Sequence, residues 1–175
     1  LSDEKKKVAI SGKFALLAER IDKLLAESDK IKSVAESIHN KKGFFYTGRG
    51  VYYPIALEGA LKLKEIAYVH AEGYAAGELK HGPIALIDED MVNVAIVAPD
   101  LHDKTISNVQ EIKARKGKIV GVGDHKDQEL KSLSDYFIGL DFSGLEELGP
   151  IYANVVNQLL AYYLAKFKGT DIDKP

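Results

Sequence analysis

Short apolar and aromatic runs alternate with longer segments of helical periodicity along most of this chain. The runs typical of strands are residues 43–47 (GFFYT), 92–98 (VNVAIVA), 118–122 (KIVGV) and 136–140 (YFIGL). The segments with helical spacing are residues 55–70, 104–115 and 148–167. Strands that alternate with helices form a parallel sheet covered by helices on both faces. The sequence therefore predicts the α/β class, as a three-layer αβα sandwich.

Two more helices are expected before the first strand. Apolar residues recur at helical spacing within residues 14–25 and again within residues 31–38. We expect residues 1–40 to form a helical segment that packs on one domain, which comprises residues 41–175.

One segment between the expected elements lacks regular periodicity. Residues 72–83 combine Gly73, Gly77 and Gly82 with mixed polar and apolar residues. Glycine at this density is typical of turns, and surface loops often carry functional groups. The segment is predicted to be an irregular loop with short helical turns.

The composition excludes several classes of protein. A length of 175 residues fits one domain, and the absence of cysteine excludes disulfide frameworks, thiol nucleophiles and thiolate zinc sites. A formal net charge of −2 without a dense basic block gives no support to nucleic-acid binding. No apolar stretch approaches the roughly 20 residues that cross a bilayer, so we expect no membrane association and a cytoplasmic location. The start at Leu1 and the end at Pro175 suggest a piece of a larger protein.

Three charged residues fall on one narrow stripe of the helix expected over residues 55–70. At 100° per residue, Lys62 lies about 40° from Glu58, and Glu65 lies about 20° from Glu58 on the other side. The residues that border this charged stripe are apolar or aromatic: Ile55, Leu61, Ile66 and Tyr68. A solvated helix face is normally broad, so the charged stripe is predicted to be sheltered from water.

Two interpretations of the charged stripe stay open. Glu58 and Lys62 form an i,i+4 pair, which on a protein surface contributes only a few tenths of a kcal/mol. In a partly dry cleft, the same carboxylate and ammonium groups can transfer protons, because burial and neighbouring charge tune their pKa values. His81 is then the candidate third member, since histidine is a common acid–base group near neutral pH.

Other motifs predict no metal or cofactor site. The H-x-E spacing of His70 and Glu72 matches zinc deaminases only in part, because those sites also need a pair of cysteines. The turn Gly48-Arg49-Gly50 begins like a dinucleotide fingerprint, but Tyr53 stands where the third glycine belongs. The five histidines show none of the spacings of zinc sites.

The runs 48–50 (GRG), 53–65 (YPIALEGALKLKE) and 75–83 (AAGELKHGP) closely resemble the glucosamine-6-phosphate synthase family. In that family these runs lie in the second of two sugar isomerase (SIS) subdomains, and the resemblance extends to Lys168-Gly169-Thr170-Asp171 near the end of the chain. It implies an SIS fold with a five-stranded parallel sheet. It also implies an enzyme that makes glucosamine 6-phosphate from fructose 6-phosphate and glutamine.

The resemblance also implies roles for single residues. Glu65 stands at the position of the base that carries a proton between C1 and C2 of the open-chain sugar imine. Lys62 matches a lysine beside the reacting oxygens, His81 matches a histidine linked to opening the sugar ring, and Glu58 is a supporting residue. His81 lies on a segment far from the helix, so it is expected to act across a subunit interface in a homodimer.

Parts of the family's machinery are not visible in this sequence. The family has a glutaminase domain with an N-terminal cysteine, a first SIS subdomain with a Ser/Thr-rich phosphate loop, and a tail with a sugar-linking lysine. Only Thr47 supplies a hydroxyl near the glycine turn, so phosphate-binding residues are expected outside this chain. The alternative is a non-catalytic SIS module that binds a phosphosugar, although such a module has no need of the carboxylate at Glu65.

Overall fold

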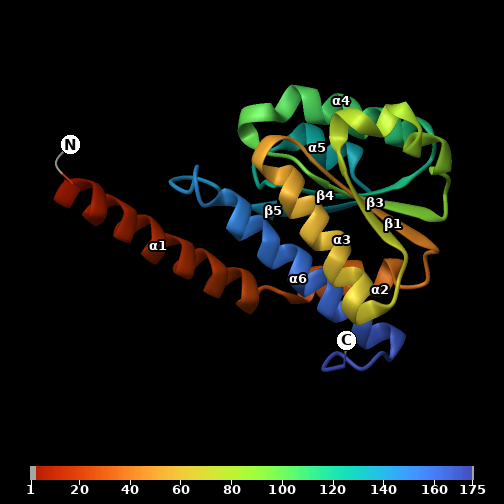
Figure 1. The fold of residues 1–175 in the computed structure, drawn as a ribbon, viewed down its shortest axis with the longest axis horizontal. Helices are drawn as coiled ribbons and strands as arrows, with labels where there is room; N and C mark the ends of the chain where they lie inside the picture. The colour runs from red at the N-terminus through yellow and green to blue at the C-terminus, as the bar shows by residue number, and fades with distance from the viewer. Residues whose placement is uncertain (1–2, 175) are drawn as a thin grey trace.

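Five parallel strands form the centre of the molecule (Figure 1). The computed structural model describes residues 3–174, and side chains from residue 10 onward; Leu1 and Pro175 lie outside the described residues. The strands are β1 (Gly43–Gly48), β2 (Ala71–Ala75), β3 (Met91–Ile96), β4 (Lys118–Asp124) and β5 (Tyr136–Leu140). They pair in the order β2-β1-β3-β4-β5, and every pair is parallel. The predicted α/β class and the five-stranded sheet are confirmed.

Helices cover both faces of the sheet and complete the three layers (Figure 1). One face is covered by α2 (Asp29–Ile38), α3 (Tyr53–Ala67) and α6 (Gly149–Lys168). The other is covered by α4 (His102–Ala114), α5 (Gln128–Leu133) and the 3₁₀ helices η2 (Ala76–His81) and η3 (Pro83–Leu86). Two further 3₁₀ turns, η1 (Gly50–Tyr52) and η4 (Pro99–Leu101), follow the carboxyl ends of β1 and β3.

The central strands are buried on both faces, which explains their continuous apolar sequence. Every residue of β1 is buried. Phe44 and Tyr46 belong to the core shared with α2, α3 and α6, whereas Phe45 belongs to the core under α4. The sequence therefore loses the alternation of polar and apolar residues that marks a half-exposed strand.

The first helix, α1 (Asp3–Ala26), extends away from the body of the molecule (Figure 1). Among its described side chains only Leu17 is buried. Arg20 forms an ion pair of 2.7 Å with Asp141, and Lys13 pairs with Glu147. The next helix, α2, packs on α6 within the core. The division between residues 1–40 and residues 41–175 stays a prediction.

The prediction of an irregular loop at residues 72–83 is wrong for residues 72–75. Residues Ala71–Ala75 form the edge strand β2, which pairs with β1, and η2 follows directly. A Cβ atom at Gly73 would lie 2.8 Å from the Cα of Leu57, so this glycine allows α3 to pack closely on the strand. A glycine required by packing is indistinguishable in sequence from one required by a turn.

Gly59 is a point of close packing between α3 and its neighbours, and we predict that Gly59→Ala destabilises the protein. The added Cβ would lie 2.6 Å from the ring of Tyr46 and 2.8 Å from Nδ2 of Asn157, and both residues are fully buried. Overpacking of this kind costs about 1–3 kcal/mol, which exceeds the helix-propensity gain of about 1 kcal/mol from Gly to Ala. Urea unfolding measures the difference.

Gly12→Ala is the matched control, because no atom lies within 4 Å of the Cβ position at Gly12 on α1. Gly12→Ala is expected to leave the free energy of unfolding unchanged or to raise it. Equal stability of the two variants would contradict the close packing at Gly59.

Candidate active site

The helix α3 is firmly placed because one of its faces consists mostly of small residues that pack closely. Its buried residues are Ala56, Gly59, Ala60, Leu63 and Ala67. The helix begins after the turn at Gly50, which has a positive φ of 54°, with Pro54 in its first turn. It ends at Tyr68, whose left-handed conformation stops the helix. The predicted extension of this helix to His70 is therefore three residues too long.

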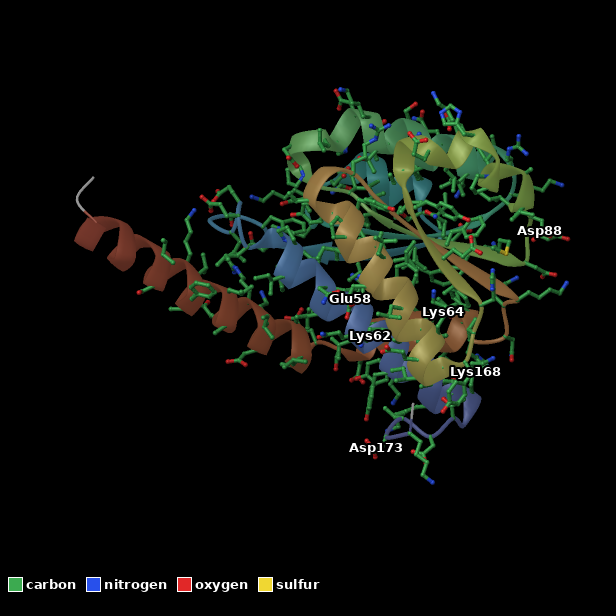
Figure 2. All side chains as sticks on the ribbon, in the orientation of Figure 1. Glu58, Lys62, Lys64, Asp88, Lys168 and Asp173 are labelled. Atoms are coloured by element: carbon green, nitrogen blue, oxygen red, sulfur yellow. The ribbon has the colours of Figure 1, made fainter. Side chains whose placement is uncertain are left out.

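The three charges of the stripe come together on α3 as predicted. Lys62 Nζ donates a hydrogen bond of 2.7 Å to Glu65 Oε2, and it lies 3.7 Å from Glu58 Oε1. The hydrogen bond to Glu65 is the main reason that the pKa of Lys62 is raised above its ordinary value. Glu58 and Lys62 follow one side of α3, next to α6 (Figure 2). The lysine thus stays positively charged between two carboxylates.

The charged stripe is partly exposed to solvent in this chain. The side chains of Glu58, Lys62 and Glu65 are 36%, 32% and 40% exposed. Leu61 and Tyr68, which were expected to shelter them, are themselves exposed. The prediction of a sheltered stripe therefore holds only in part for this chain alone, because about a third or more of each charged side chain stays exposed. Exclusion of water from the stripe requires a second protein surface.

His81 lies apart from the charged stripe. It is an exposed residue at the end of η2, which packs against α4 on the opposite face of the sheet from α3. The buried Leu79 fixes η2 in the core on that side. Glu65, Lys62 and Glu58 therefore form one group, and the structure does not bring His81 to it within a single chain.

A separate pocket lies at the carboxyl ends of the strands. Its volume is about 360 Å³, and its charged lining residues are Asp100, Asp124, Lys126, Asp141 and Glu146. Carboxylates outnumber the single lysine, so the pocket is unfavourable for a phosphate group. No member of the charged stripe lines it.

The sequence carries a signal for this pocket in the aspartates that follow the predicted strands, although no motif spacing marks them. Asp100, Asp124 and Asp141 each stand at or just after the end of a strand. The carboxyl ends of parallel strands meet at one edge of the sheet, which is where α/β proteins commonly bind ligands. Tyr52, also in the lining, is buried, and this burial and the charge of Asp100 raise its pKa to about 12.

The described residues contain neither a metal cluster nor a membrane-spanning helix. Within residues 3–174, no group of three or more histidines and carboxylates is arranged to hold a metal ion. No helix in the described part of the chain is both long enough and apolar enough to span a membrane.

Solved structures with the same fold include a domain of an aminotransferase. The C-terminal domain of glucosamine-fructose-6-phosphate aminotransferase from Francisella tularensis superposes with a TM-score of 0.86 at 39% identity. The match covers 100% of this chain and 49% of that chain. Glucosamine-6-phosphate deaminase from Thermotoga maritima superposes with a TM-score of 0.63 at 21% identity, over 90% of this chain and 47% of that chain, which shows the fold alone.

Several curated proteins with similar sequences are named glutamine--fructose-6-phosphate aminotransferase [isomerizing]. The protein from Methanothermobacter thermautotrophicus is 49% identical over 158 residues, which is 90% of this chain and 27% of that protein. The protein from Escherichia coli is 48% identical over 162 residues, 91% of this chain and 26% of that protein. This chain thus spans about a quarter of the length of these relatives. A sequence model of the SIS domain matches residues 37–166, and the chain therefore belongs to the SIS domain family.

Proposed function

We propose that this chain is the second isomerase domain of an isomerizing glutamine–fructose-6-phosphate aminotransferase. The complete enzyme would form glucosamine 6-phosphate from fructose 6-phosphate and glutamine. The similarity to proteins of that name over about 90% of the chain supports this assignment. The observation that carries it is the contact of 2.7 Å between Lys62 and Glu65 on a tightly packed helix.

The proposed chemistry moves a hydrogen between adjacent carbons of the sugar. In the open-chain imine, the Glu65 carboxylate would take a proton from C1 and return it to C2, so one base serves both carbons. As the C1 hydroxyl proton passes to the imine nitrogen, giving the C1 carbonyl and the C2 amine, the Lys62 ammonium would stabilise the negative charge that grows on the C1 oxygen. Glu58, 3.7 Å from Lys62, would hold that ammonium in place as a supporting residue.

The exposure of the charged stripe implies that other protein surfaces complete the site. Electrostatic stabilisation is much stronger where water is excluded. We propose that the first SIS domain of the longer chain covers the stripe and supplies the phosphate-binding groups. We also propose that His81 reaches the site of a second copy in a homodimer, where it assists opening of the sugar ring.

The alternative function, a non-catalytic module that binds a phosphosugar, is less well supported. The pocket at the strand ends has more carboxylates than lysines, which disfavours a phosphate in this chain. A binding module also has no use for a carboxylate and an ammonium in direct contact on α3.

The cytoplasmic location expected from the sequence stays part of the enzyme proposal.

The role of Glu65 is tested by Glu65→Gln in the complete enzyme. The amide cannot act as a base, so formation of glucosamine 6-phosphate should fall by at least roughly a hundredfold. Hydrolysis of glutamine should stay measurable, because it does not require proton transfer on the sugar. Glu36→Gln, a change of the same kind at an exposed position of α2, is the control. Unchanged synthesis by the Glu65 variant would remove the assigned role.

The role of Lys62 is tested by the variant Lys62→Met in the complete enzyme, with Lys64→Met as the control. Loss of the ammonium is expected to lower kcat by roughly 10²- to 10³-fold, the range seen when one stabilising donor is removed. Lys64 lies two residues further on, on another side of α3 (Figure 2), so its replacement should leave kcat within about twofold. Equal kcat values for the two variants would show that the charged stripe has no special function.

The proposed domain contact predicts that the isolated chain self-associates. Leu57 and Leu61 are exposed apolar residues on α3, the helix that carries the charged stripe. Light scattering at high concentration should detect a species larger than the monomer. Leu57→Glu should lower the fraction of the chain in that species. Leu86→Glu, at an exposed position on η3, should not. A purely monomeric chain at high concentration would contradict this expectation.

A further inference from the structure

Buried polar side chains gather where η2 packs on the sheet and α4. Thr47 on β1, Asn93 on β3 and Asn108 on α4 are all at least 94% buried. Thr47 Oγ1 donates a hydrogen bond of 3.0 Å to Asn93 Oδ1. This hydrogen bond ties β1 to β3 on the face that α4 covers, because its loss would leave the buried Thr47 hydroxyl without this partner.

Arg49 joins three elements at this place. It follows β1 directly, at the point where the chain leaves the sheet for α3. Its Nε and Nη2 atoms both donate to Asn108 Oδ1 on α4, at 3.3 Å and 3.2 Å. Its guanidinium group also lies against η2, because a Cβ atom at Gly77 would be only 2.8 Å from Nη2 and 3.3 Å from Cζ.

The contact at Gly77 links Arg49 to His81. Gly77 is the second residue of η2 (Ala76–His81), and His81 is the last. Runs of 3₁₀ helix longer than three or four residues are uncommon, since their hydrogen bonds are poor, so η2 needs support from outside. Ala76 and Leu79 supply apolar support from the core, and Arg49 supplies the polar contact at the start.

We propose that Arg49 is a positioning residue that fixes η2, and therefore His81, relative to β1 and α4. The inference rests on the role proposed above for His81. The hydrogen bonds of the Arg49 side chain go to Asn108 and not to the charged stripe. Arg49 therefore influences the reaction only through the position of η2. The guanidinium is required because it places two donors on one oxygen while its Nη2 and Cζ atoms lie close to Gly77; an ammonium group cannot do both.

The test is a double-mutant cycle in the complete aminotransferase, with Arg49→Lys, His81→Ala and the double variant. Arg49→Lys should lower kcat for glucosamine 6-phosphate by roughly ten- to a hundredfold, since small displacements of a reacting group have effects of this size. The KM for fructose 6-phosphate should change by less than about twofold. The double variant should be no slower than His81→Ala, because Arg49 acts only through His81.

Two further variants separate positioning from folding. Arg115→Lys makes the same change at an exposed arginine after α4 and should leave kcat unchanged. Gly77→Ala leaves Arg49 and His81 intact but pushes on the guanidinium from η2, and should reproduce the loss of kcat. Arg49→Lys could also lower the melting temperature of the enzyme. In that case the Gly77 variant and the double-mutant cycle still distinguish a positioning role of Arg49 from a role in folding.

Three results would overturn the inference. They are unchanged kcat in both the Arg49 and Gly77 variants, losses that multiply in the double variant, and unchanged kcat in His81→Ala. The last result would remove the role of His81 while leaving that of Glu65 to its own test. A large loss in His81→Ala together with full activity in Arg49→Lys and Gly77→Ala would reject the positioning role alone.

Discussion

The close packing of α3 against β1, β2 and α6 is the constraint on which the rest of this structure depends. Gly59 meets Tyr46 and Asn157, and Gly73 of β2 meets the backbone of Leu57, at distances that leave no room for a Cβ atom. Small residues on the inner face hold the helix in one rotation. The outer face therefore presents Lys62 between Glu58 and Glu65 in a fixed direction, and proton transfer depends on such fixed geometry.

The chain provides the proposed reacting groups, Glu65 and Lys62, without enclosing them. Charges that are about one-third exposed interact weakly through water, and a hydrogen bond of 2.7 Å between Lys62 and Glu65 adds little to stability at a surface. The same pair becomes effective once a second surface removes the water. The exposed apolar residues beside the pair on α3 are suited to such a contact, and the length of the relatives leaves room for further domains.

The sequence predicts those features that depend on local periodicity. Strands such as residues 43–47 are continuous apolar runs because both faces are covered, and the grouping of Glu58, Lys62 and Glu65 follows from 3.6 residues per turn. Features that depend on distant neighbours were not predictable. The edge strand β2 has only one fully buried residue, so it lacks the apolar run of a central strand. The exposure of the charged stripe depends on which surfaces lie next to it in space. Arg49 donates a hydrogen bond to Asn108, which lies 59 residues further along the chain.

The most direct test is a crystal structure of the complete protein with bound fructose 6-phosphate in its open-chain form. We expect the Glu65 carboxylate to lie within about 3.5 Å of C1 and C2, the distance of a near-attack geometry, with Lys62 beside the neighbouring oxygen. We also expect all three charged residues of α3 to be buried by a second domain. A sugar bound elsewhere, with Glu65 and Lys62 still in open solvent, would contradict the proposed function.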